Sequence, residues 1–135
     1  MPVLALSTAA TINLEGNTIV NNDSAGNFLR IQADSWGNSG SNGGTVTLNL
    51  SKQSADGNIV VDSISKLTMN LKNGSSFKGT INNKNAGEVA LNLDSSSTLT
   101  LTGDTYVKSL TNADTTNSNI KLNGHKLYVN GVELK

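Results

Sequence analysis

Residues that could catalyse a reaction are few in this sequence, and they are scattered. General acid–base catalysis needs carboxylates brought together, or carboxylates placed beside a base. The ten acidic residues are spread over the 135 positions of the chain. Asp62, Asp104 and Lys84 would meet only if folding stacked their segments, and solvated surface charge is the simpler interpretation. The sequence therefore predicts a protein that is not an enzyme.

The only histidine gives the same indication. His125 follows Asn123 and Gly124, a pair that is typical of turns. One histidine by itself makes neither a catalytic triad nor a metal site. The absence of cysteine also excludes thiolate metal sites and disulfides. From the residues alone we expect no bound cofactor.

Trp36 is the residue best suited to hold a sugar. It lies in a stretch rich in Gly, Ser and Asn, with Asp34 two residues before it and Asn38 two residues after it. An indole face can stack on a sugar ring while neighbouring carboxylate and amide groups bind hydroxyls. The alternative is that Trp36 folds back and covers an apolar end of the structure.

A second candidate surface consists of polar residues that return at a fixed interval. These residues are Thr47, Thr68, Asn49, Asn70 and Asn92. On stacked strands, about 4.8 Å apart, they would form a regular polar face that fits a polysaccharide. The alternative is structural, because asparagines in such a stack also hydrogen-bond to one another. The threonine row is interrupted at its third position by Ala90.

These polar residues belong to three matching segments, 45–50, 66–71 and 88–93. Their sequences are TVTLNL, KLTMNL and EVALNL, and corresponding residues lie 21 and then 22 positions apart. Apolar and polar residues alternate in each segment, as in a half-buried strand. Like strands that return about every 20 residues are typical of solenoids. A fourth match, TINL at 11–14, lies 36 residues before 47–50.

The repeat predicts an all-β fold, a right-handed single-stranded parallel β-helix of about four to five coils. Stacked coils place like residues above one another, whereas hairpins do not need matching strands at this interval. No stretch has apolar residues at helical spacing, so we expect almost no helix. The alternative is an antiparallel sandwich of hairpins, because Asn-Gly pairs also favour hairpins.

Other strands are expected between and around the matching segments. A second strand of each coil is predicted at 58–61, 77–81 and 98–102, joined by corners with Gly and Asn, which adopt positive φ angles readily. We expect 120–122 to reopen the Leu-Asn-Leu motif after a polar loop at 111–119. The remaining predicted strands are 1–6, 18–20, 28–32, 106–110, 127–129 and 132–134.

The length and composition fit one domain, 1–135, in which 35–44 form a projecting loop rather than a linker. More than a third of the residues are Asn, Ser or Thr, but the periodic placement of apolar residues argues against disorder. The first residues lack the basic start of a signal peptide. One interpretation is that the chain is the C-terminal part of a longer secreted protein.

Charge and hydropathy argue against two kinds of partner. Ten acidic and ten basic residues give a net charge of zero, and the only arginine is Arg30, so no basic stripe is available for nucleic acid. No apolar run approaches the roughly 20 residues that span a bilayer. Another copy of the chain is a possible partner through the coil ends, because an open parallel edge can pair with a strand of another chain.

Three segments resemble a known family. LTMNLKNGSSFKGTI at 67–81 looks like the repeat of secreted clostridial β-helix proteins, usually described as carbohydrate-binding domain-containing proteins. STLTLTGDTYVKSL at 97–110 resembles their closing coil, in which a tryptophan often stands at the position of Leu99. NIKLNGHKLYV at 119–129 is similar to their C-terminal tail. The resemblance covers roughly residues 45–135, and autotransporter passenger domains end in similar segments.

The resemblance implies a right-handed β-helix related in shape to pectate lyases, without known catalysis. It implies binding of cellulose or acidic sugars, a place outside the cell or on its surface, and bound calcium. This chain departs from the family at the calcium sites, because it has no corner of the Asp-x-Asp-Gly type. We therefore expect a polysaccharide-binding extracellular module. The alternative is a structural or adhesive solenoid that stacks end to end.

Overall fold

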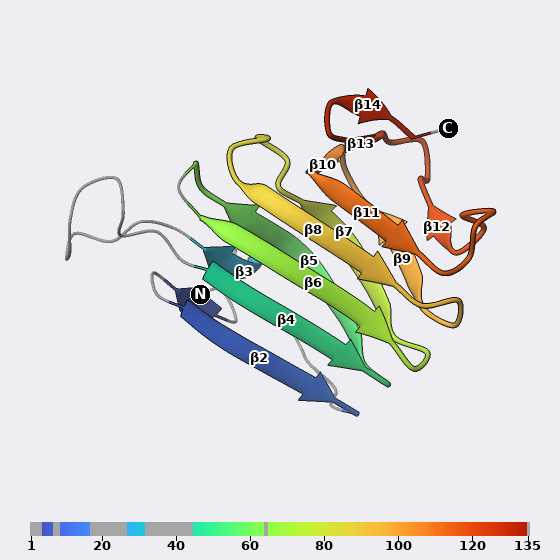
Figure 1. The fold of residues 1–135 in the computed structure, drawn as a ribbon, viewed down its shortest axis with the longest axis horizontal. Coiled ribbons are helices and arrows are strands. Elements are labelled where there is room, and N and C mark those ends of the chain that lie inside the picture. Colours follow the sequence, from blue (N-terminus) through green and yellow to red (C-terminus); the bar gives the residue numbers. More distant parts are fainter. Residues whose placement is uncertain (1–3, 7–8, 17–26, 32–44, 64, 135) are drawn as a thin grey trace.

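The computed structural model describes residues 4–6, 9–16, 27–31, 45–63 and 65–134, and these residues form strands and turns without any helix. Figure 1 shows the strands stacked side by side. In chain order they are β1 (Leu4–Leu6), β2 (Ala9–Glu15), β3 (Asn27–Ile31), β4 (Thr45–Ser51), β5 (Ser54–Val61), β6 (Lys66–Lys72), β7 (Ser76–Ile81), β8 (Glu88–Leu93), β9 (Thr98–Leu101), β10 (Thr105–Val107), β11 (Ser109–Asn112), β12 (Ile120–Lys121), β13 (Leu127–Val129) and β14 (Val132–Glu133).

The strands form three sheets. The first sheet has the order β11-β8-β6-β4-β2, and the second sheet has the order β1-β3-β5-β7-β9-β12. Every pair of neighbours in these two sheets is parallel, because the chain alternates between the sheets as it advances from coil to coil. A small third sheet contains β10, β13 and β14. The result is a parallel β-solenoid of about four turns, which confirms the predicted fold class.

Like residues stack directly over one another in the first sheet. Leu14 is paired with Leu50, Leu50 with Leu71, and Leu71 with Leu93. Leu14 and Leu50 are 36 residues apart, whereas the later leucines are 21 or 22 apart. The extra residues lie in the connection between β2 and β4, and the register of these two strands is unchanged. The antiparallel sandwich is excluded, because its hairpins would not place these leucines in one parallel column.

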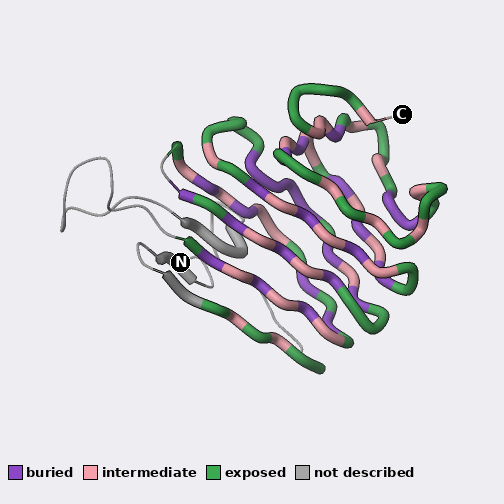
Figure 2. Tube along the Cα trace, in the orientation of Figure 1, coloured by how far each residue is buried: buried purple, intermediate pink, exposed green. Residues whose placement is uncertain are grey.

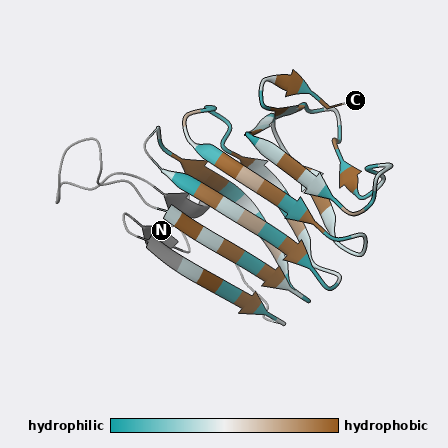
Figure 3. Cartoon of the chain, in the orientation of Figure 1, coloured by the Kyte–Doolittle hydropathy of each residue, from teal (hydrophilic) through white to brown (hydrophobic). Residues whose placement is uncertain are grey.

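The core lies between the first and second sheets. Figure 2 shows buried and half-buried residues alternating along β4, β6 and β8, and Figure 3 shows the same alternation in hydropathy. Leu48, Met69 and Leu91 form one fully buried column, and Phe77 of the second sheet is buried in the same core. Each such side chain contributes about 1.5–3 kcal/mol by leaving water, before the conformational entropy is counted.

The C-terminal part departs from two of our expectations. Residues 106–110 are not one strand, because the chain turns at exposed Lys108 from β10 in the third sheet to β11 in the first. The Lys108 amide donates to the Val89 carbonyl at 2.8 Å and fixes this corner. In addition, 120–122 do not continue the Leu-Asn-Leu column, because Ile120 pairs with Leu99 in the second sheet. The first sheet is continued instead by β11, which begins within the predicted 106–110 strand and extends into the segment expected to be a loop. There Leu110 pairs with Leu91, but Asn112 takes the place above Leu93.

An antiparallel hairpin closes the C-terminal end of the third sheet. β13 and β14 are joined by Asn130 and Gly131, whose φ angles of 49° and 81° are those of a tight hairpin turn. Tyr106 and Tyr128 pair in register on this sheet, and their rings stack with centroids 4.8 Å apart and planes 6° from parallel. Among the described residues, Asn130-Gly131 is the only Asn-Gly pair that joins two strands of a hairpin.

Two aspartates accept hydrogen bonds at turns between strands. Asp94 receives the Asn73 backbone N–H at 2.7 Å from the coil below and the Ser96 and Ser97 hydroxyls at 2.8 Å from its own turn. Slight burial raises the pKa of Asp94, but these hydrogen bonds outweigh it and lower the pKa below its usual value. In a second turn, hydrogen bonds from the Ser118 and Thr116 hydroxyls lower the pKa of Asp114 to about 2. Both groups are ionised at neutral pH.

Gly79 is required by a close approach between two coils. A Cβ atom at this position would lie 1.8 Å from the carbonyl oxygen of Gly57 and 3.0 Å from the Phe77 ring. The atom on the neighbouring coil belongs to the backbone of β5, which pairs with β7 in register and cannot shift by itself.

We expect Gly79→Ala to lower the free energy of unfolding by about 3 kcal/mol or more, because the methyl group overpacks the core. Gly74→Ala is the matched control, since Gly74 has a φ of 76° and open space around it. Its cost should be the left-handed conformation alone, about 1–2 kcal/mol. Urea denaturation measures both, and equal losses would show that the close approach does not matter.

Candidate functional site

The asparagines predicted from the repeat form a continuous hydrogen-bonded ladder on the outer face of the first sheet. Asn92 donates to Asn70 at 2.7 Å, Asn70 donates to Asn49 at 2.7 Å, and Asn49 donates to Asn13 at 2.8 Å. Each donor is a side-chain Nδ2 and each acceptor is an Oδ1. The structural role that the sequence left open is therefore present.

The ladder leaves part of each amide available to a ligand. A side-chain amide has two N–H donors and two acceptor lone pairs. Asn49 and Asn70 each use one donor and one lone pair within the ladder. Both side chains are half-buried, so their orientation is fixed while their outer atoms still meet solvent. The ladder thus holds amide groups in fixed positions, one on each coil.

A hydroxyl row runs beside the ladder. Thr11, Thr47 and Thr68 pair in register, and the row continues through Ala90 to Ser109. Thr47 and Thr68 are half-buried, and Thr11 and Ser109 are exposed. The structure therefore brings five of the predicted site residues, Thr47, Thr68, Asn49, Asn70 and Asn92, together on one face.

The other three predicted site residues, Asp34, Trp36 and Asn38, lie outside the described residues, as does the whole 35–44 segment. The described ends nearest to them are Ile31, which pairs with Val61, and Thr45, which pairs with Lys66. Sugar binding by Trp36 stays a prediction.

A row of charges borders the hydroxyl row, and sequence reasoning missed it as part of a site. Glu88 lies between two lysines, with one carboxylate oxygen 3.8 Å from the Lys66 ammonium and the other 3.4 Å from the Lys108 ammonium. All three side chains are at least half exposed, so these ion pairs contribute little to stability. A sequence signal existed, because Lys66 and Glu88 occupy the same position of the repeat with opposite charges.

The face is hollowed where the charges and hydroxyls meet. A shallow cavity of about 390 Å³ lies over the beginning of β6, β8 and β11. Its polar lining includes Lys66, Glu88 and Lys108 from the charged row, Thr68 and Ser109 from the hydroxyl row, and Asn130 from the hairpin turn. Two lysines and one glutamate give this lining a net charge of +1, which favours a ligand that carries acidic groups.

The three charged residues considered together in the sequence, Asp62, Lys84 and Asp104, do not share one hollow. Asp62 and Lys84 line one hollow on the second sheet, but Asp104 does not line it. The carboxylate of Asp104 instead accepts the Lys126 backbone N–H at 2.9 Å. The Asp62 carboxylate accepts the Ser65 hydroxyl at 2.5 Å.

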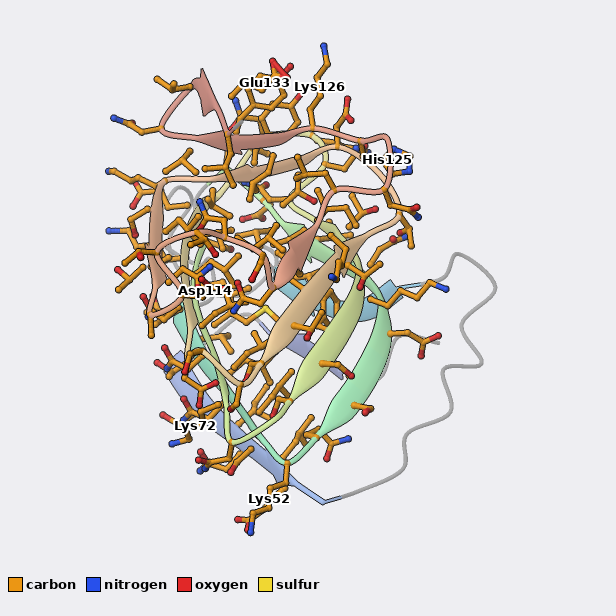
Figure 4. The ribbon with its side chains drawn as sticks, turned by 90° about the vertical axis from the view of Figure 1, so that its right-hand side faces the viewer. Lys52, Lys72, Asp114, His125, Lys126 and Glu133 are labelled. Carbon is orange, nitrogen blue, oxygen red and sulfur yellow. The ribbon has the colours of Figure 1, made fainter. Side chains whose placement is uncertain are left out.

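His125 lies in a turn and is only partly exposed. Its backbone N–H donates to the Leu122 carbonyl at 2.9 Å. Figure 4 shows His125 and Asp114 on different sides of the molecule. In the described part of the chain, no three His, Cys, Asp or Glu side chains gather in a way that could hold a metal ion. The donor set for the calcium implied by the resemblance is therefore not found there.

No protein-family model, no curated protein and no solved structure matches this chain. The clostridial family expected from the sequence stays a prediction, and the function must be argued from the face itself. Among the described residues, none belongs to a helix long and apolar enough to cross a membrane.

The ladder makes a quantitative prediction. Asn70→Ala removes two ladder bonds and should lower the free energy of unfolding by about 2 kcal/mol, since one net hydrogen bond contributes about 1 kcal/mol. Asn13→Ala removes one bond at the end of the ladder and should cost about half as much. Urea unfolding measures the two variants. A loss no larger for Asn70→Ala than for Asn13→Ala would show that the ladder bonds do not each contribute to stability.

Proposed function

We propose that this protein is a non-catalytic extracellular module that binds polysaccharide on the outer face of its first sheet. The ladder of Asn13, Asn49, Asn70 and Asn92, the hydroxyl row and the charged row form that face. The observation that carries the proposal is the repetition of the same polar groups from coil to coil in fixed register. A polysaccharide likewise presents the same groups again and again along its length.

The chemistry of the face fits sugar hydroxyls. A sugar hydroxyl both donates and accepts, and so do the amides and hydroxyls of Asn and Thr. The ladder holds the amides before any ligand arrives, so little side-chain entropy is lost on binding. The rows cross β4, β6 and β8, so one sugar chain can contact several coils at once.

The charged row favours acidic polysaccharides over neutral ones. Lys66 and Lys108 are exposed and only weakly held by Glu88, so a ligand carboxylate can replace that partner. Glu88 opposes the same ligand by repulsion. The two lysines therefore raise the affinity for an acidic ligand, and Glu88 lowers it. Removing the lysines and removing the charge of Glu88 should change the affinity in opposite directions.

We expect the double variant Lys66→Ala/Lys108→Ala to bind polygalacturonate about tenfold more weakly than the unchanged protein, and Glu88→Gln to bind it more tightly. Both shifts should shrink as salt is raised. Affinity electrophoresis with polygalacturonate measures this, together with a pull-down on insoluble cellulose. Trp36→Ala, measured in parallel, tests the predicted loop contribution.

Lys78→Ala/Lys121→Ala is the matched charge control, since both lysines are exposed on the second sheet and lie outside the lining of the hollow. If the two double variants lose affinity equally, the effect is net charge and not a site. Retention no greater than background on both polysaccharides would reject the proposed function.

A structural or adhesive solenoid that associates through its ends is the second candidate. The ladder favours it, because asparagines bonded along the stack strengthen the stack itself. In the described part of the chain, β2 and β1 are the outermost strands at one end, and β14 turns antiparallel at the other. Parallel edges such as β2 pair readily with other chains, whereas lysine on an edge opposes pairing.

If this candidate holds, sedimentation velocity should show a size that rises with protein concentration. Thr11→Lys on β2 should abolish the rise, because it places charge on the edge strand. Thr111→Lys is the matched change on β11, the last strand at the other end of the first sheet. A loss with both variants would indicate head-to-tail stacking, and a strict monomer at high concentration would contradict the candidate.

A further inference from the structure

A hollow larger than the one on the first sheet lies on the second sheet, on the other side of the core from the ladder. Its volume is about 730 Å³, within the range of small-molecule sites. The floor is a column of outward polar side chains from three successive coils, Asn58, Thr80 and Thr102. The Thr80 and Thr102 hydroxyls lie 3.1 Å apart and hydrogen-bond to each other. Val60 adds an apolar strip beside this column.

The wall of this groove is a loop, 82–87, that is held in place before any ligand binds. Asn82 is 2% exposed, and its Nδ2 donates to the carbonyls of Gly87 at 2.9 Å and Tyr106 at 3.2 Å. Its Oδ1 accepts the backbone N–H groups of Ala86 and Gly87, each at 3.2 Å. One buried amide thus fixes both ends of the loop.

The loop is also tied to its neighbours on both sides. Asn83 donates to the Asp104 carbonyl at 2.9 Å in the next coil. At Gly87 there is no space for a side chain, because a Cβ atom would lie 2.2 Å from Val61. Lys84 and Ala86 of the same loop are exposed and line the groove. A groove with a preformed wall loses little entropy when it binds a ligand.

The lining of the groove selects one chemical class of ligand. Lys84 and Asp62 bring one charge of each sign, so neither a polyanion nor a polycation is favoured. A purely apolar ligand would strip water from Asn58 and Thr80 without replacing their hydrogen bonds. Amides and hydroxyls that both donate and accept match a ligand rich in hydroxyl groups, and Val60 and Ala86 match the apolar face of a sugar ring.

We propose that this groove is a second carbohydrate site, which binds a segment of a neutral oligosaccharide. It stands independently of the ladder face, because it lies on a different sheet and takes a ligand without charge. The two sites together would let one copy of the protein hold two polysaccharide chains of different charge.

The test uses the whole chain and neutral hexaoses of glucose, xylose and mannose, with trigalacturonate as the acidic probe. Backbone NMR should show that at least one neutral hexaose shifts the amide signals of Asn58, Thr80 and Thr102, whereas trigalacturonate does not. In calorimetry, Ala86→Trp should weaken that binding about tenfold or more by filling the groove, without touching the core.

Ala113→Trp is the matched control, since Ala113 is exposed and lies outside the lining of the groove. It should bind the neutral hexaose as the unchanged protein does, and so should Lys66→Ala/Lys108→Ala. The positions of the shifted signals separate the two sites, because a hexaose on the ladder face would shift the amide signals of Asn49, Asn70 and Asn92 instead, so that failure of one proposal does not imply failure of the other. The inference is overturned if no neutral hexaose shifts the floor signals, or if Ala86→Trp binds as tightly as Ala113→Trp.

Discussion

Parallel stacking of like side chains in register is the interaction on which the rest of this structure depends. Leu50, Leu71 and Leu93 stack on the inside of the first sheet, and Asn49 and Asn70 hydrogen-bond on the outside of the same strands. The two columns support each other, because a shift of one residue would turn the leucines to solvent and break the asparagine bonds. Register is therefore fixed from both faces of the sheet.

This constraint explains how the chain tolerates connections of different length. The corner between β5 and β6 needs only four residues, 62–65, whereas the corner between β7 and β8 has six, 82–87. The strands return to the same register after both, and the extra residues leave the coil as the loop held by Asn82. Stability thus comes from contacts between neighbouring coils, as in other repeat proteins, and the corners are free to carry other features.

Both proposed sites follow from the same architecture. A stacked coil repeats its outward side chains about every 4.8 Å, so any polar residue kept at one position of the repeat becomes a row. On the first sheet the rows are asparagine, hydroxyl and charge, and they make an open face with one shallow hollow. On the second sheet the column of Asn58, Thr80 and Thr102 lies beside a raised corner, which converts a similar row into a groove.

The sequence by itself determined the class of fold, the register of β4, β6 and β8, and the asparagine rows, because an interval of 21 or 22 residues is visible as letters. It did not determine the last coil, where β10 and β11 separate at Lys108 and Ile120 joins the second sheet. There the intervals change, and only packing against the preceding coil selects the sheet. The charged hollow and the groove also needed the tertiary structure. Asn58, Thr80 and Thr102 follow the repeat at intervals of 22 residues, but the loop 82–87 that forms the wall of the groove is placed by the hydrogen bonds of buried Asn82. Lys108 meets Glu88 only because the corner between β10 and β11 packs on the preceding coil.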